Sequence, residues 1–152
     1  VLTKARNISV GKKAREFALP ATNGGVCEIL LDIDCKKADS LDLVISNKAG
    51  ERVVMKYNAS GKTFSFDRRT SGIVNFSQDF PAVTVAPTFN TDNKLSLRIF
   101  IDKSSMEVFG NGGKFAMTNL VFPNEPYSQI SVSAFGGKAT IDNLKIFPIK
   151  EL

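Results

Sequence analysis

Histidine and tryptophan are absent from this chain of 152 residues, which contains only two cysteines and two tyrosines. Without histidine, the chain cannot build a Ser-His-Asp or Cys-His nucleophile system or a histidine-based metal site. With no tryptophan and few tyrosines, we expect no flat aromatic platform of the kind that binds pyranose chains. No P-loop or dinucleotide-binding fingerprint is present either. These absences exclude several common classes of active site, and we expect no metal or other cofactor.

Long apolar runs are also absent. No run approaches the roughly 18 residues needed to span a bilayer, so we expect no membrane insertion. The N-terminus lacks a basic segment followed by an apolar one, and the chain begins at Val1, as a processed product or an excised domain would. Hydrophobic residues make up 43% of the chain and charged residues 23%, a composition typical of a single globular domain, here 1–152.

The chain is moderately basic. Its formal net charge of +5 comes from 20 lysines and arginines against 15 aspartates and glutamates. The basic residues are dispersed in short groups at 12–15, 36–37 and 68–69, whereas nucleic-acid binders more often concentrate them in one stripe with interleaved aromatics. We therefore interpret these groups as solvated surface and expect no nucleic-acid partner.

The two cysteines lie in the segment VCEILLDIDC, where Cys27 and Cys35 share one parity with Ile29, Leu31 and Ile33. On one straight strand, eight residues of about 3.3 Å each separate the two cysteines by roughly 26 Å, far beyond the roughly 7 Å limit for a disulfide. We predict two buried, unpaired thiols, unless the segment bends sharply.

Turn signals rich in Asn and Gly recur along the chain and separate short alternating segments of β-branched and aromatic residues. No segment shows helical periodicity. The pattern favours an all-β, two-sheet antiparallel β-sandwich of the jelly-roll or concanavalin-like kind, with a closed barrel as the alternative. The predicted strands span residues 16–19, 26–35, 41–46, 52–57, 63–68, 82–86, 95–101, 105–109, 114–122, 129–134 and 140–147.

Two segments fall outside this regular pattern. The segment 80–89 contains Pro81 and Pro87, which cannot donate to a central ladder, so we expect an edge strand or a crossover between sheets. No strand is predicted in residues 1–12, which we interpret as the remnant of a connection to something upstream.

The segment 95–122 reads as a β-meander. From Leu95 to Ile101, leucine or isoleucine occupies every second position, and the polar turn that follows reverses the chain. If Lys103 and Ser104 form a two-residue loop, Ile101 lies opposite Met106. The other face of this hairpin is then predicted to carry Arg98, Phe100, Glu107 and Phe109.

Asp102 and Glu107 are two carboxylates close to this turn. Glycoside hydrolysis needs two carboxylates roughly 5 to 9.5 Å apart, so this pair is the obvious one to consider. In the predicted register, however, Glu107 lies diagonal to Arg98, and a cross-strand ion pair explains it without catalysis. Asp102 is in the usual place for a side chain that accepts hydrogen bonds from turn amides. We favour structural roles, then sugar binding, and catalysis last.

A second constellation ends the strand at 63–68. Phe64 and Phe66 point to one face, taken as the core face, so Asp67 and Arg69 project together from the other. An arginine beside a carboxylate can bind vicinal sugar hydroxyls through several hydrogen bonds. The alternative is an ordinary surface ion pair.

Two motifs carry a family resemblance. The first is Asp102-x-Ser104-Ser105-x-Glu107-Val108-Phe109-x-Asn111, followed by Val121-Phe122-Pro123. It resembles the C-terminal β-sandwich of family 32 glycoside hydrolases, which are levanases, inulinases and invertases. The upstream segment FDRRTSG at 66–72 is similar to that family's Tyr/Phe-Asp-Arg-x-x-Ser-Gly, and residues 139–146 look like its final strand. The resemblance spans roughly 26–148.

The resemblance implies a two-domain enzyme in which a five-bladed β-propeller with the catalytic carboxylates precedes this sandwich. The family's catalytic motifs are Asn-Asp-Pro-Asn-Gly, Arg-Asp-Pro and Glu-Cys, and none of them occurs in this chain. No catalytic residue is therefore carried over, and the propeller of the same polypeptide is the expected partner. An extracellular or periplasmic location is the matching expectation.

For the sandwich itself, the resemblance implies two alternatives. It is either a support for the propeller, in which case we expect an exposed apolar patch, or a module that binds the terminal fructose of levan. The resemblance to levan-binding modules implies that acidic and arginine side chains bind the sugar. By residue type and approximate placement, the matching candidates are Asp67, Arg69, Asp102 and Glu107.

Overall fold

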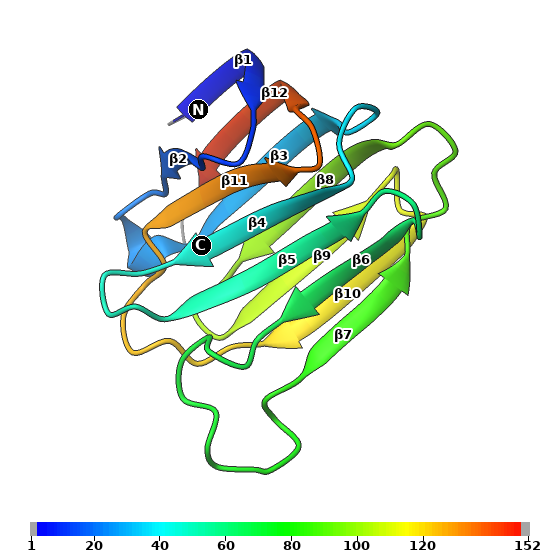
Figure 1. The fold of residues 1–152 in the computed structure, drawn as a ribbon. Helices are drawn as coiled ribbons and strands as arrows, with labels where there is room; N and C mark the ends of the chain where they lie inside the picture. The colour runs from blue at the N-terminus through cyan, green and yellow to red at the C-terminus, as the bar shows by residue number, and fades with distance from the viewer. Residues whose placement is uncertain (1–2, 150–152) are drawn as a thin grey trace.

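In a computed structural model, which describes residues 3–149, two six-stranded antiparallel sheets pack face to face (Figure 1). The strand order is β1-β12-β3-β8-β9-β10 in the first sheet and β2-β11-β4-β5-β6-β7 in the second. The strands are β1 (Thr3–Val10), β2 (Arg15–Ala18), β3 (Cys27–Asp34), β4 (Ser40–Ser46), β5 (Arg52–Asn58), β6 (Thr63–Asp67), β7 (Val83–Pro87), β8 (Lys94–Ile101), β9 (Ser105–Gly110), β10 (Phe115–Leu120), β11 (Gln129–Phe135) and β12 (Ala139–Pro148). The predicted antiparallel sandwich is confirmed.

The core lies between the two sheets and follows the period-two pattern of the strands. In β3, the apolar residues Ile29, Leu31 and Ile33 are buried, while the residues between them are partly or fully exposed. The second sheet contributes Phe64 and Phe66, which are also fully buried. Alternation in the sequence is therefore what assigns each strand an inner and an outer face.

Both cysteines point into this core. Cys27 and Cys35 are buried and unpaired, as predicted. Burial in apolar surroundings raises the pKa of the Cys27 thiol to about 12 and that of Cys35 to about 11. Because the thiolate is the reactive form, both are inert packing side chains at neutral pH.

The strand β1 was not predicted, and it corrects the interpretation of residues 1–12. It pairs with β12 from Thr3 opposite Ile146 to Val10 opposite Ala139, so most of this segment belongs to the sandwich rather than to a connection. The reason for the miss is an irregularity in the strand. Asn7 has a positive φ of 54° and is skipped in the pairing, which breaks the alternation of exposed and buried residues.

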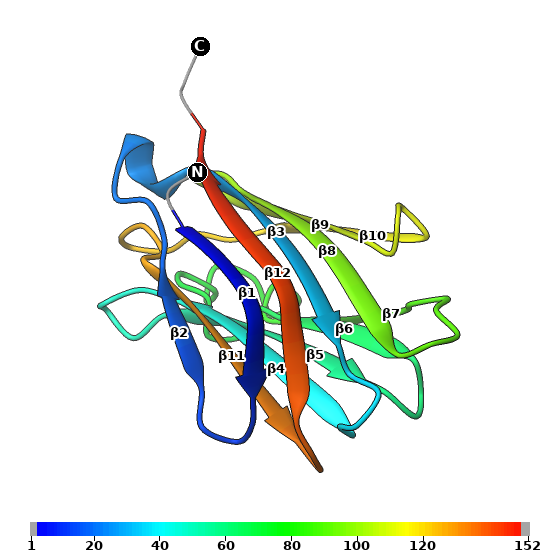
Figure 2. The ribbon, with the colours of Figure 1, turned by 90° about the horizontal axis from the view of Figure 1, so that it is seen from above.

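The proline-containing segment 80–89 behaves as expected. It forms the edge strand β7, which ends at Pro87, and the chain then crosses to β8 of the other sheet. Seen from above, the sandwich has two open edges, one formed by β1 and β2 and the other by β7 and β10 (Figure 2). These two edges differ in chemistry.

Candidate functional site

The hairpin of β8 and β9 has the predicted register. Ile101 pairs with Met106 and Ile99 with Val108, and the backbone N–H of Asp102 donates to Ser105 O at 2.9 Å to close the turn. All four apolar residues of these pairs are buried. The outer face of the hairpin is therefore fixed by the packing of its inner face.

The predicted ion pair between Arg98 and Glu107 is wrong. Arg98 Nε donates instead to Glu28 Oε1 at 2.6 Å, and its guanidinium lies 4.8 Å from the centre of the Phe100 ring. Glu28 on β3 and Glu107 on β9 both stand directly opposite Phe100, one on each side. Both carboxylates are thus diagonal to Arg98, which pairs with the one on β3.

Asp102 and Glu107 come together at the surface. Asp102 Oδ1 accepts the backbone N–H of Lys103 at 2.7 Å, the turn role expected from the sequence. Both side chains line one hollow of about 280 Å³, together with Phe100 and Ser105. The hollow therefore presents two carboxylates and a hydroxyl beside one aromatic ring.

Asp67 and Arg69 form a bidentate ion pair, as expected. Arg69 Nε donates to Asp67 Oδ1 at 3.0 Å and Nη2 donates to Oδ2 at 2.7 Å. This hydrogen bonding from Arg69 holds the pKa of the Asp67 carboxyl below its usual value. Asp67 ends β6 of the second sheet, whereas Asp102 and Glu107 belong to the first. The four candidate sugar-binding residues are therefore two separate pairs on two sheets.

Arg68, which the sequence analysis did not single out, holds the signature segment 66–72 in place. Its Nε donates to Phe80 O at 2.9 Å and its Nη1 to Leu120 O at 3.3 Å, and its guanidinium lies 4.0 Å from the centre of the Phe80 ring. The fully buried Ser71 donates from its hydroxyl to Arg68 O at 2.6 Å. Tyr127 donates its phenolic hydrogen to Ser71 O at 2.6 Å. This arginine thus ties β6 to the end of β10.

The two signature motifs pack directly against each other at Gly72. A Cβ on Gly72 would lie 2.2 Å from Phe122 O, so only glycine permits this approach. The next residue, Ile73, donates its backbone N–H to the same oxygen at 2.9 Å. The order of the two motifs along the chain was visible in the sequence, but their contact was not.

Asn111, the last residue of the longer signature, also has a structural role. Its φ is +52°, in the left-handed region that this tight turn uses. Its Nδ2 donates to Thr88 O at 2.8 Å and its Oδ1 accepts the backbone N–H of Ser96 at 3.0 Å. These bonds fix the β9–β10 hairpin to the crossover between β7 and β8. The fold itself therefore accounts for the signature residues Gly72 and Asn111.

An exposed apolar patch lies at the β7–β10 edge. We call Ile73, Phe76 and Leu120, which are 47%, 59% and 52% exposed, the apolar patch. The ring of Phe76 contacts those of Phe80 and Phe122, which also contact each other, with centroid separations of 4.7 to 5.6 Å. The long β6–β7 loop that carries Ile73 and Phe76 projects beyond the ends of β6 and β7 (Figure 1). Such an arrangement favours contact with another surface.

Two kinds of feature are absent from residues 3–149. No cluster of three or more cysteine, aspartate or glutamate side chains in this part of the chain is arranged to hold a metal ion. None of its helical segments has the length and hydropathy that crossing a bilayer requires.

Comparison with known proteins places this fold and these motifs in one family. The chain is 33% identical to a Bacillus levanase over 68% of its own length and 11% of that protein, and 28% identical to the Bacillus subtilis levanase over 98% and 22%. The crystal structure of an exo-inulinase from Aspergillus awamori superposes with a TM-score of 0.83 at 24% identity, covering 99% of this chain and 29% of that one. The chain thus spans less than a third of each of these relatives. Residues 2–148 match the profile of glycosyl hydrolases family 32, C terminal, and the chain belongs to that family as its C-terminal domain.

Proposed function

We propose that this domain is a non-catalytic support that docks against, and stabilises, a catalytic β-propeller within the same polypeptide. The apolar patch of Ile73, Phe76 and Leu120 is the observation that carries the proposal, because monomeric surfaces rarely leave such side chains exposed together. The chain covers only 22% of the Bacillus subtilis levanase, so a parent of similar length has room for a catalytic domain.

The energy available from the patch is sufficient for such a role. Full burial of a Leu, Ile or Phe side chain contributes about 1.5 to 3 kcal/mol, and each patch residue is roughly half exposed, so covering all three contributes about 2 to 4 kcal/mol. The Phe76, Phe80 and Phe122 rings hold the patch in a defined shape before docking. A preformed apolar surface loses little conformational freedom on binding.

The parent is proposed to hydrolyse a fructan or sucrose outside the cell. Several relatives are named levanase or extracellular exo-inulinase, and this chain carries none of the three catalytic motifs of the family. The bond-breaking carboxylates are accordingly assigned to the propeller, and the domain described here contributes stability.

The test uses the parent polypeptide with the triple substitution Ile73→Ser, Phe76→Ser and Leu120→Ser. We expect the thermal midpoint of the catalytic domain to fall and its activity half-life on heating to shorten. Phe89→Ser is the matched control, because Phe89 is 60% exposed but lies between β7 and β8, outside the patch. Equal thermal midpoints for the wild type and the triple variant would refute the docking role.

A second candidate function is fructan binding. The hollow that Asp102 and Glu107 share beside Phe100 favours it, because carboxylates accept hydrogen bonds from sugar hydroxyls. The Asp67–Arg69 pair is the other candidate contact, on the second sheet. Calorimetric titration of the chain with levan, inulin and fructose tests this function. Comparing the variants Asp102→Asn and Glu107→Gln with the variants Asp67→Asn and Arg69→Gln shows which of the two pairs contacts the sugar. Absence of heat at millimolar sugar excludes it.

A further inference from the structure

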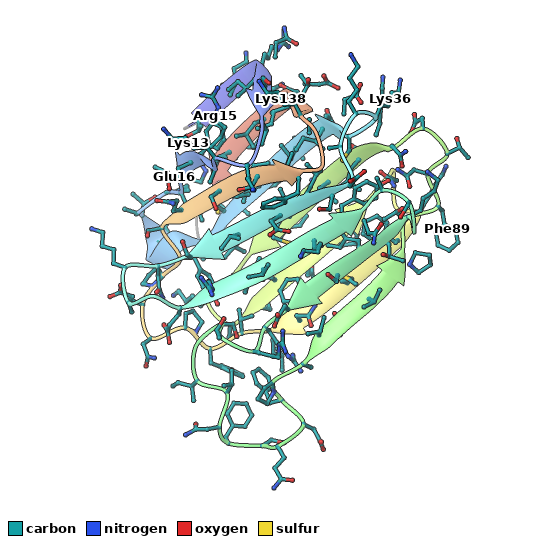
Figure 3. All side chains as sticks on the ribbon, in the orientation of Figure 1. Lys13, Arg15, Glu16, Lys36, Phe89 and Lys138 are labelled. Atoms are coloured by element: carbon teal, nitrogen blue, oxygen red, sulfur yellow. The ribbon has the colours of Figure 1, made fainter. Side chains whose placement is uncertain are left out.

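A hollow of about 520 Å³ lies at the turn between β1 and β2, at the edge opposite the apolar patch. Figure 3 shows Lys13, Arg15 and Lys138 gathered at this corner of the sandwich. Four of its seven lining residues are cationic and none is acidic. We call this the basic hollow, and its cations are Lys12, Lys13, Arg15 and Lys138.

The four cations line the same hollow and are not drawn into ion pairs with carboxylates of residues 3–149. Arg15 Nε donates to Ser9 O at 3.2 Å, which orients the guanidinium across the β1–β2 turn. None of the ion pairs found among residues 3–149 involves any of the four cations. The nearest carboxylate along the chain, that of Glu16, lines an adjoining hollow with Lys13 and Arg15. Like charges around one hollow repel each other, and a bound anion relieves that repulsion.

A second hollow on the first sheet shows that this charge pattern is particular to one corner. It has a similar volume of about 500 Å³ and also contains two lysines, Lys94 and Lys114. Three aspartates line the same hollow and balance them: Asp32, Asp92 and Asp142. The basic hollow has no such compensation, although the chain as a whole carries only +5.

The position of the basic hollow leaves it accessible when the apolar patch is covered. Ala139 pairs with Val10 at the end of β12 that carries the hollow. At the other end of β12, Pro148 pairs with Cys27, which pairs in turn with Ile101. Leu120 of the apolar patch lies beyond this row of paired residues. The two features are thus at opposite edges and at opposite ends of the sandwich.

We propose that the basic hollow binds an anionic polysaccharide, a glycan with repeated carboxylate or sulfate groups. Several such groups can meet lysine and arginine at once, and Arg15 can donate to one of them in a bidentate manner. The hollow has no aromatic lining residue on which a nucleic-acid base would stack. The role goes beyond support of the propeller, because it attaches the parent protein to a charged matrix.

The test measures binding of the isolated chain to polygalacturonate and to dextran sulfate by affinity electrophoresis and calorimetry. We expect binding to either polymer at 50 mM salt that weakens at least severalfold at 300 mM, since exposed charges are screened. Lys12→Gln with Lys13→Gln should weaken binding about tenfold, and Lys138→Gln, from the turn between β11 and β12, about threefold. Lys94→Gln with Lys114→Gln removes the same charge as the first pair and should leave the affinity within about twofold.

Each alternative outcome is informative. Equal weakening by the two lysine pairs would show that net charge alone is sensed, and would overturn the proposal. Equal binding of neutral dextran, or tighter binding of single-stranded DNA than of both polysaccharides, would overturn it as well. Preference for polygalacturonate assigns carboxylates as the ligand groups, and preference for dextran sulfate assigns sulfates. Thermal unfolding of each variant confirms that a loss of binding is not a loss of fold.

Discussion

The two edges of the sandwich differ in how their surfaces are organised. At the β7–β10 edge, the two family signatures meet, with Gly72 against Phe122 and Arg68 bonded to Leu120, and the apolar patch lies at the same edge. At the β1–β2 edge, four cations surround a hollow and no signature residue is present. The family signatures therefore mark the junction around Gly72, whereas the charged corner is independent of them.

The largest effect on this comparison should come from Gly72→Ala. Its Cβ would lie 2.2 Å from Phe122 O and 2.7 Å from Pro123 Cα, so backbone must move, at a cost of about 3 kcal/mol. Chemical denaturation of the isolated chain measures this loss in the free energy of unfolding. Gly61→Ala is the control, because its nearest contacts would be at 3.7 Å, and the change should cost well under about 1 kcal/mol. Similar losses for both would mean that the signature junction is not close-packed.

Adjacent arginines provide the next contrast. Arg68→Ala removes two hydrogen bonds to backbone oxygens and the contact with Phe80, and should lower the free energy of unfolding by about 2 kcal/mol. Arg69→Ala removes an exposed pair with Asp67 and should have little effect. Urea denaturation of the two variants measures both losses of unfolding free energy. Equal stability of both would assign Arg68 to the surface rather than to the junction.

Acid should loosen the segment that follows Phe122. Glu51 is partly desolvated, but hydrogen bonds from Asn47 and Asn124 outweigh that effect and lower the pKa of its carboxyl. A lowered folded-state pKa contributes stability above the unfolded value of about 4.3, and that stability is lost as the pH falls through the folded-state pKa. Glu51→Gln should flatten this part of the stability profile. An unchanged profile would show that Glu51 does not anchor the segment.

The smallest effect is expected at the other edge. Lys12→Gln with Lys13→Gln removes repulsion in the basic hollow and touches no buried contact, so the thermal midpoint should stay constant or rise slightly at low salt. Differential scanning calorimetry at 20 mM and 300 mM salt checks this. A marked loss of stability would mean that these lysines have structural partners.

How far the sequence predicts this structure depends on the range of the contacts. The parity of Ile99 and Val108 sets the hairpin register, and Pro87 correctly marks an edge strand, because both depend on neighbouring residues. The predicted partner of Arg98 was wrong because Glu28 is 70 residues away in sequence and reaches Arg98 only through the pairing of β3 with β8.

The junction at Gly72 and the basic hollow depend on contacts between distant segments. Lys138 joins Lys12 only because the β1–β2 and β11–β12 turns meet at one corner. The candidate sugar residues show the same limit, since Asp67 and Asp102 are equally suited by type yet lie on different sheets. Local patterns therefore predict strands and faces, and long-range packing decides which side chains share a site.

The docking claim is tested most directly by hydrogen–deuterium exchange of the isolated chain and of the parent polypeptide under the same conditions. We expect peptides covering 73–76 and 120–122 to exchange more slowly in the parent, while the peptide covering 11–15 exchanges equally in both. Unchanged exchange at 73–76 and 120–122, or new protection confined to 11–15, would contradict it.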